Sequence, residues 1–306
     1  MKHLLGLTVA RMGFFVLIQT PVIAVSDEAH APRLMTAATR ADPAALATLQ
    51  KPGEVLFRDD FESDASFQNY FEVRGLKEGR VKRVAEPGFA RRGNGALQLT
   101  AVARDGKESG AGVTGWLGDA GHDRVYLRLY IRYAEDYDQG NLNHTGGSLA
   151  AVAGNNRWEG MGLAGVRPRG DDRFSARFEP WCDWRRLTPP GYLFLYAYWM
   201  EMQGDRDGKY WGNMLGPETG ERFVPVRGRW YCLEHMIKAN DPGESNGELA
   251  AWIDGTLYIH YTGIRWRSSP AVRLKRFDLG VYIHSSAKDN TVWFDDVVLS
   301  TGYVGP

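Results

Sequence analysis

Short runs of alternating apolar and polar residues, separated by turn-forming residues, recur along most of this chain. A period of two places successive side chains on opposite faces, which predicts half-buried β-strands and not helices. The clearest runs occupy residues 55–62, 95–102, 125–133, 174–179, 192–199, 230–239, 247–254, 257–261, 277–285 and 291–299. Between two of these runs, Asp254-Gly255 is typical of a two-residue hairpin turn. The chain is therefore expected to be all-β.

Strand-like runs that do not alternate with helices favour an antiparallel two-sheet β-sandwich of jelly-roll type. The 36 glycines and an aromatic content of 12% suit strands joined by tight turns. Sandwich sheets bend, and a concave sheet supplies a groove for an extended polymer. Two loops rich in Gly, Asn and aromatic residues, 136–157 and 204–223, are expected to wall this groove.

The chain is expected to divide into three parts. Residues 1–31 resemble a secretory signal peptide, with a basic start at Lys2 and an apolar run that is too short to span a bilayer. Residues 32–54, rich in Ala, Thr and Pro, are interpreted as a linker with a helix-compatible piece at Pro43–Leu49. Residues 55–306 would form one domain. The protein is then secreted or periplasmic.

The charge balance and the two cysteines bear on the binding partners and on a disulfide. The formal net charge is zero, with 37 basic and 37 acidic residues, so no overall field attracts nucleic acid or an anionic membrane. We expect a monomer that needs no membrane after signal cleavage, and any anionic ligand must be attracted locally. Export would permit a disulfide between Cys182 and Cys232, although two buried free thiols fit equally well.

Two neighbouring runs pair an apolar face with a face of chemically capable side chains. The polar or aromatic faces carry Ser175, Arg177 and Glu179 on the first run and Tyr192, Phe194, Tyr196 and Tyr198 on the second. Tyrosine rings stack on sugars, phenols exchange protons, and a guanidinium binds a carboxylate through two hydrogen bonds. This face suits an acidic polysaccharide, although ordinary solvent-facing strands carry similar residues.

Hydrolysis of such a polymer would require two opposed carboxylates. The sequence has no Glu-x-Asp-x-x-Glu run, and Glu179 and Glu234 are the remaining pair. Zinc patterns, a phosphate loop and a nucleophile elbow are absent from the sequence. Cleavage by β-elimination instead needs a neutraliser for the uronate carboxylate, a base and an acid. Arg177 suits the first task, and Tyr196 and Tyr198 suit the others, with the guanidinium lowering the pKa of a tyrosine base.

The Ser-x-Arg sequence at Ser175 and the Tyr-x-Tyr sequence at Tyr196 resemble two strands of polysaccharide lyase family 14. The similarity continues through Trp230, Glu234, Asn240, Asn246-Gly247, Trp252-Ile253-Asp254-Gly255 and Trp293–Val298, and covers roughly residues 55–303. The resemblance implies a concanavalin A-like jelly roll that cleaves alginate or a related polyuronate. It also implies that Ser175, Arg177, Tyr196 and Tyr198 form the active site.

The chain departs from this family at one catalytic residue. The family has a lysine on the strand before Ser-x-Arg, but no lysine occurs here between Lys107 and Lys209. The corresponding region is 141–147, where His144, Asn141 or Asn143 are the candidates to replace it; alternatively, the site has lost its chemistry. Histidine could neutralise or accept a proton near neutral pH.

The remaining expectations concern binding groups and cofactors. Substrate-binding residues are expected at Tyr192, Asn143, Glu179, Tyr282 and His284. No cofactor is expected for catalysis, but a structural Ca²⁺ could bind where acids of the first and last strands meet, at Asp59, Asp60, Glu62, Asp295 and Asp296. The sequence therefore predicts a lyase for an acidic polysaccharide, with a non-catalytic carbohydrate-binding protein and a sandwich glycoside hydrolase as the alternatives.

Overall fold

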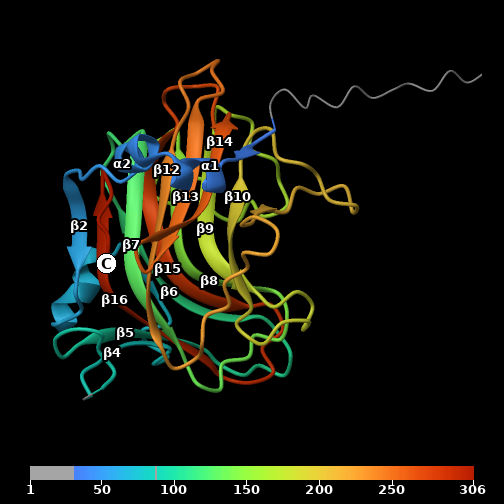
Figure 1. Ribbon diagram of the computed structural model, residues 1–306. Coiled ribbons are helices and arrows are strands. Elements are labelled where there is room, and N and C mark those ends of the chain that lie inside the picture. Colours follow the sequence, from blue (N-terminus) through green and yellow to red (C-terminus); the bar gives the residue numbers. More distant parts are fainter. Residues whose placement is uncertain (1–30, 87) are drawn as a thin grey trace, which may run out of the picture.

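Two antiparallel sheets stack face to face in this protein (Figure 1). The structure, a computed structural model, describes residues 31–86 and 88–306. The expected signal peptide lies outside these residues except for Ala31. The all-β sandwich predicted from the alternating runs is confirmed.

One sheet, which we call the outer sheet, has the order β1-β14-β13-β12-β7-β16-β5-β4, with β2 also paired to β16. Its strands are β1 (Arg33–Leu34), β2 (Val55–Asp59), β4 (Val81–Val84), β5 (Ala96–Ala101), β7 (Arg124–Tyr133), β12 (Trp230–Lys238), β13 (Gly247–Ile253), β14 (Thr256–Ile264) and β16 (Asn290–Ser300).

The other sheet, the groove sheet, has the order β11-β10-β9-β8-β15-β6-β3. Its strands are β3 (Glu72–Arg74), β6 (Ser109–Trp116), β8 (Asn143–Val152), β9 (Arg173–Trp181), β10 (Tyr192–Tyr198), β11 (Asn213–Leu215) and β15 (Arg273–Ile283). In the described part of the chain, three short helices complete the fold: α1 (Thr36–Ala41), α2 (Pro43–Leu49) and the 3₁₀ helix η2 (Asp64–Asn69).

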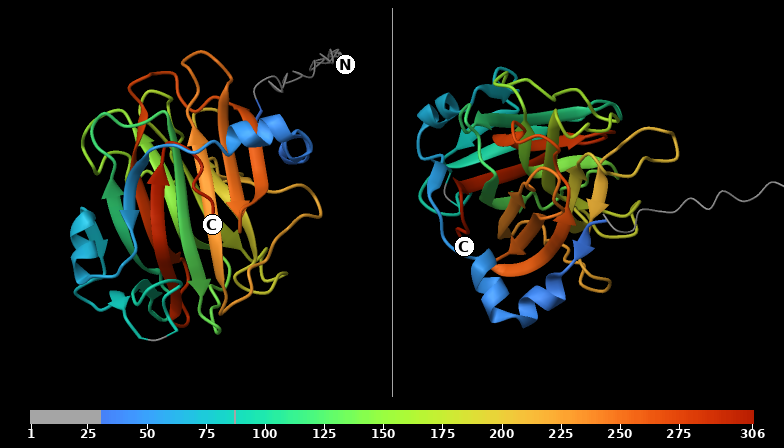
Figure 2. Two further views of the ribbon diagram at one scale, coloured as in Figure 1. Left: turned by 60° about the vertical axis from the view of Figure 1, so that its left-hand side comes forward. Right: turned by 90° about the horizontal axis from the view of Figure 1, so that it is seen from above.

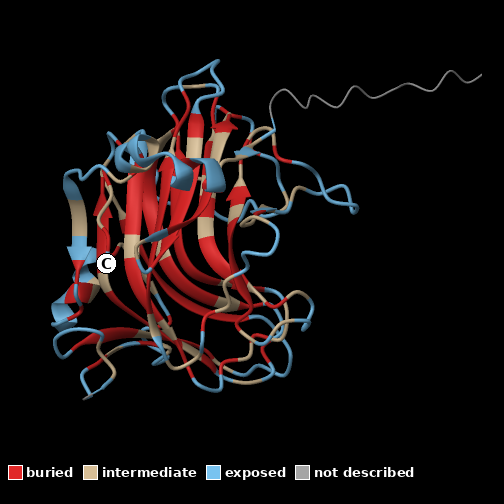
Figure 3. Ribbon diagram, viewed as in Figure 1, coloured by how far each residue is buried: buried red, intermediate tan, exposed pale blue. Residues whose placement is uncertain are grey.

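The core fills the space between the two sheets, because each strand turns its apolar positions inward. In β7, Val125, Leu127, Leu129 and Ile131 are at most 2% exposed. Figure 3 shows the same pattern throughout, with buried strands and exposed connections. The opposite face of the groove sheet is therefore free to carry polar side chains.

The sequence predicted a loop over residues 136–157, but part of this segment forms strand β8. This strand lies in the middle of the groove sheet. Its two glycines have a packing role. A Cβ on Gly146 would lie 2.2 Å from the carbonyl oxygen of Phe178, and a Cβ on Gly147 would lie 2.6 Å from the side chain of Leu129. The Gly-Gly pair, which lies in the predicted Gly-rich loop, instead allows close approach to β9 and to the outer sheet.

Residues 32–54 are folded, so the prediction of a linker there is wrong. Strand β1 pairs with β14, and the Asp42 side chain caps α2 by accepting bonds from the N–H groups of Ala44 and Ala45. Leu49 of α2 is buried with Tyr126 and Trp252 against the outer sheet, as Figure 2 shows for the placement of the helices. The helix-compatible piece at Pro43–Leu49 is confirmed. Among the described residues, no helix has the length and apolar character needed to cross a membrane.

The two cysteines are buried free thiols, so the disulfide that export would permit is not formed. Cys182 lies just after β9, with its Sγ 3.2 Å from the carbonyl oxygen of Gly140. Cys232 lies on β12 in the other sheet. Their positions leave the sandwich to be held by packing and strand pairing.

Glu234 of β12 anchors the C-terminal tail on the outer face of the outer sheet. Its carboxylate, which is 1% exposed, accepts bonds of 2.9 Å from the N–H groups of Val304 and Gly305. Burial raises the pKa of Glu234 from its ordinary 4.5 to about 7, against the lowering effect of these hydrogen bonds. The folded chain therefore holds this proton more tightly than the unfolded chain does.

We expect the free energy of unfolding to fall as the pH rises from about 4.5 to 7, because unfolding releases the Glu234 proton in this window. The change attributable to Glu234 is at most about 3 kcal/mol. Burial also raises the pKa of Asp295, to about 6, which adds a slope of the same sign. Urea unfolding at pH 5 and pH 8 should show a smaller difference for Glu234→Gln than for the wild type. Equal differences in the two proteins would contradict this assignment.

Candidate active site

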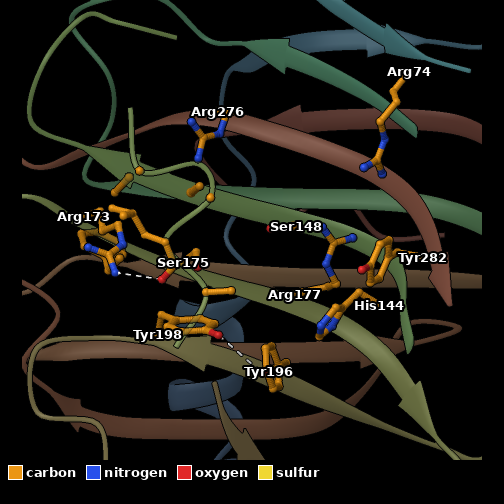
Figure 4. Close-up of a pocket in the computed structure, with 17 residues that line it drawn as sticks. Arg74, His144, Ser148, Arg173, Ser175, Arg177, Tyr196, Tyr198, Arg276 and Tyr282 are labelled. Atoms are coloured by element: carbon orange, nitrogen blue, oxygen red, sulfur yellow. Dashed lines mark hydrogen bonds between the residues drawn. The ribbon is translucent and has the colours of Figure 1, made fainter. Parts of the chain in front are cut away.

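Side chains from four adjacent strands meet on the exposed face of the groove sheet, around a pocket of about 320 Å³ (Figure 4). The strand register brings them together. Arg177 of β9 is paired with Ser148 of β8 on one side and Tyr196 of β10 on the other. Two residues along, Ser175 is paired with Tyr198. The Ser-x-Arg and Tyr-x-Tyr runs thus lie side by side, as the sequence predicted.

The two tyrosines form a hydrogen-bonded pair. Their Oη atoms are 3.4 Å apart, and the N–H of Gly212 donates to the Oη of Tyr196 at 2.8 Å. Since Tyr196 accepts from Gly212, its own proton is free to point toward Tyr198. Burial, followed by the neighbouring Tyr198, raises the pKa of Tyr196. The lowered pKa expected for a tyrosine base is therefore not found at Tyr196.

Arg177 is engaged by carboxylates of the protein. Its Nη1 donates to the carbonyl oxygen of Gly146 at 3.0 Å, and its Nη2 forms an ion pair with Asp278 of β15. The Nε atom lies 3.8 Å from a carboxylate oxygen of Glu179. Two acids thus compensate the charge of this guanidinium.

His144 of β8 is oriented by Glu179. Its Nδ1 lies 3.0 and 3.1 Å from the two carboxylate oxygens of Glu179, whose side chain is 1% exposed. A carboxylate is an acceptor, so a neutral His144 carries its proton on Nδ1 and has an acceptor at Nε2. The ring packs beside Tyr196, with centroids 4.9 Å apart, and stacks on Tyr282 at 6.2 Å. His144 thus presents one nitrogen toward the pocket.

Three residues predicted to bind substrate lie elsewhere or are covered. Asn143 is 7% exposed, and its side chain donates to the carbonyl oxygen of Pro180. Tyr192 is 6% exposed because the Arg222 guanidinium covers its ring at 4.4 Å. Glu179 is buried beneath His144. These three side chains support the groove and do not face an open binding surface.

The other two predicted binding residues lie beside His144. Tyr282 of β15 lines the pocket and donates from its hydroxyl to Glu108. His284 follows the end of β15, with its ring centroid 5.3 Å from that of His144. Burial lowers the pKa of His284, as does the neighbouring His144. These aromatic side chains enclose His144 from the β15 side.

The hydrolase alternative, based on Glu179 and Glu234, is wrong because the two carboxylates belong to different sheets. Glu179 is on the groove sheet, whereas Glu234 is on the outer sheet and binds the C-terminal tail. They cannot oppose each other across one sugar.

Asp59 and Asp295, two of the acids proposed for Ca²⁺, accept hydrogen bonds within the protein. Asp59 accepts from the N–H of Phe61 and the hydroxyl of Ser66, and Asp295 accepts from the N–H groups of Arg91 and Arg92. In the described part of the chain, no group of three or more His, Cys, Asp or Glu side chains is placed to hold a metal ion.

Several pocket residues were missed by the sequence analysis. They are Arg74, Ser148, Arg173 and Arg276, which line the pocket, and Asp278, which binds Arg177. Arg276 and Asp278 share the face of Tyr282 by the two-residue period, but the predicted strand began at residue 277, one residue too late to include Arg276. Ser148 was hidden by the loop prediction. No lysine lines this pocket in residues 31–86 and 88–306.

Comparison with known proteins gives one family and a set of similar structures. The model of the family described as Polysaccharide lyase 14 matches residues 103–285, which is more than half of the 306 residues. No curated protein matches the sequence.

Several alginate lyases have similar structures. The marine PL-14 alginate lyase from Aplysia kurodai has a TM-score of 0.58 and 14% identity, covering 83% of this chain and 98% of that one. Alginate lyase vAL-1 from Chlorella virus has a TM-score of 0.56 and 13% identity, with coverages of 81% and 99%. Alginate lyase Aly36B has a TM-score of 0.53 and 16% identity, with coverages of 80% and 96%. At these identities the likeness concerns the fold.

Proposed function

The chain belongs to the polysaccharide lyase 14 family, and we propose that it cleaves a uronic-acid polysaccharide by β-elimination in the pocket of the groove sheet. The observation that carries the proposal is the hydrogen-bonded pair Tyr196 and Tyr198, placed beside Arg177 and His144. This arrangement offers proton-transfer groups and cations around one cavity. It needs no second carboxylate opposite Glu179.

In the proposed reaction, Tyr198 as a phenolate removes the proton from C5 of the uronate. The electron pair forms the C4–C5 double bond, and the C4–O bond to the leaving sugar breaks. Tyr196, which burial keeps protonated, gives its proton to the leaving oxygen. The hydrogen bond between the two hydroxyls then allows a proton to return from Tyr198 to Tyr196, which restores the starting state.

Three further residues bind and orient the uronate in this proposal. Arg177 and Ser175 hold the sugar from β9. His144 contacts the reacting uronate through its Nε2. It takes the place of the family's catalytic lysine, which this chain lacks. Glu179 is a positioning residue, because it fixes the orientation of His144 without touching the polymer. Export from the cell, as the N-terminal sequence suggests, would bring this site to an extracellular or periplasmic polymer.

The test is to mix the purified protein with alginate, glucuronan and other uronate polymers and to follow the ultraviolet absorbance of unsaturated uronate ends. Alginate comes first because the similar structures are named as alginate lyases. A rise with at least one polymer is expected. Binding of a polymer without any rise would contradict elimination and favour the carbohydrate-binding alternative, which the absence of a lysine from the pocket recommends as the second candidate.

A further inference from the structure

Arg276 of β15 is a buried cation that uses two of the five N–H donors of its guanidinium. Its relative exposure is 8%. Its Nη1 donates to the carbonyl oxygens of Arg157 and Glu159, at 3.0 and 2.7 Å. Within residues 31–86 and 88–306, Nε and Nη2 have no hydrogen-bond partner, and no carboxylate oxygen lies within ion-pair distance. One edge of the guanidinium is therefore anchored and the other is free.

The neighbouring arginines of the pocket differ from Arg276 in this respect. Arg177 is paired with Asp278 and Glu179, and Arg173 is paired with Asp172 at 2.8 Å. A buried charge without a partner is costly, so native proteins usually pair it. Burial lowers the pKa of Arg276, and the more distant carboxylates, Asp278 first, oppose this effect without cancelling it. The free protein therefore lacks a counter-ion at this position.

The position of Arg276 indicates where a counter-ion would come from. Its side chain lines the pocket together with Ser148, Ser175 and Tyr198, and Figure 4 shows it on the β15 side of the cavity. It also lines the adjoining cavity beside Arg177 and Asp278. The free Nε and Nη2 groups form the edge of a guanidinium that accommodates a carboxylate through two parallel hydrogen bonds. A carboxylate of a ligand in the pocket would meet this free edge.

We propose that Arg276 forms a carboxylate-binding subsite for the substrate, and that this residue, not the already paired Arg177, makes the main ionic contact with the polymer. The identity of the ligand as a uronate rests on the proposed function. Arg74 of β3 lines the same pocket, is exposed, and has no hydrogen bond or ion pair to the residues that the structure describes. It extends the subsite with a second free cation at the rim. The site therefore selects polymers with free carboxylates over esterified or reduced ones.

The experiment measures binding in a Tyr198→Phe background, so that turnover does not interfere. Calorimetry compares a polyuronate with the same polymer after reduction of its carboxylates to alcohols. The acidic polymer should bind more tightly, and Arg276→Gln should lower this preference by about tenfold or more, because a charge-assisted bidentate contact is lost. Arg276→Lys keeps the positive charge but not the two parallel N–H donors, and it should recover part of the preference for the acidic polymer. An unchanged preference in Arg276→Gln would overturn the proposal.

Arg173→Gln is the matched control. Arg173 also holds the loop over the pocket, by donating to the carbonyl oxygens of Leu163 and Val166, but it has its own carboxylate partner. Arg173→Gln should change the preference for the acidic polymer by no more than about twofold, because Arg173 is not expected to bind a carboxylate of the polymer. Equal losses in the two variants would show that Arg276 only anchors the loop, and would also overturn the proposal.

The outcomes for the subsite and for the reaction are separable. If the protein with Tyr198 intact yields no unsaturated ends, elimination fails, but a preference that depends on Arg276 would still establish the subsite. If unsaturated ends form at an unchanged KM in Arg276→Gln, the reaction stands and the subsite is refuted.

Discussion

Replacing Tyr198 by Phe should reduce the rate of cleavage by about 10²–10⁴-fold, the usual contribution of a positioned acid or base. The change removes one oxygen atom, whose hydrogen-bond partner among the described residues is Tyr196. The polymer should still bind, because the ring remains and the cations of the pocket are untouched. Initial rates from the absorbance of unsaturated ends, measured with the affinity for the same polymer, check the prediction.

Tyr196→Phe is the companion variant, and it should behave differently. Its hydroxyl accepts the N–H of Gly212, so its loss leaves a backbone donor without this partner and should cost about 1–3 kcal/mol of stability. The rate of cleavage should also fall, because the proton for the leaving oxygen is lost. Unchanged turnover in both variants would refute the assignment of the tyrosine pair, whatever their stabilities.

Much of the fold was predictable because most strands have one apolar and one polar face. β7, β9, β10 and β12 alternate clearly, and they were found within one or two residues. β8 was missed because its first six residues, Asn-His-Thr-Gly-Gly-Ser, lack the large apolar residues that mark a strand. Its glycines are required by neighbours on another strand and in the other sheet, and contacts of this kind cannot be read from the local pattern.

The site was predictable only where its residues share a strand. Ser175 with Arg177, and Tyr196 with Tyr198, follow the two-residue period. The pairing of Arg177 with Asp278 spans 101 residues of sequence and depends on β8 lying between their strands. Burial could not be foreseen either: Glu179 and Tyr192, predicted to bind substrate, are 1% and 6% exposed.

Replacing Glu179 by Gln should lower the turnover number by about 10²-fold, with a smaller effect on KM, because the change acts through the orientation and charge of His144. The carboxylate accepts the Nδ1 proton, whereas an amide can also donate to Nδ1 and so favour the tautomer with its proton on Nε2. In that tautomer His144 presents a donor to the pocket instead of an acceptor. His144→Gln should lose about as much activity as Glu179→Gln.

Asp278→Asn separates the effect of Glu179 on His144 from its effect on Arg177. Both acids pair with Arg177, but Glu179 alone of the two contacts His144. If Glu179 acts through His144, the double variant His144→Gln/Glu179→Gln should be no slower than either single variant, since residues that act as a unit are not additive. Asp278→Asn should then add its own, independent loss to that of His144→Gln. If Glu179→Gln instead combines additively with His144→Gln, Glu179 serves Arg177, and the lysine that the chain lacks is not replaced by an oriented histidine.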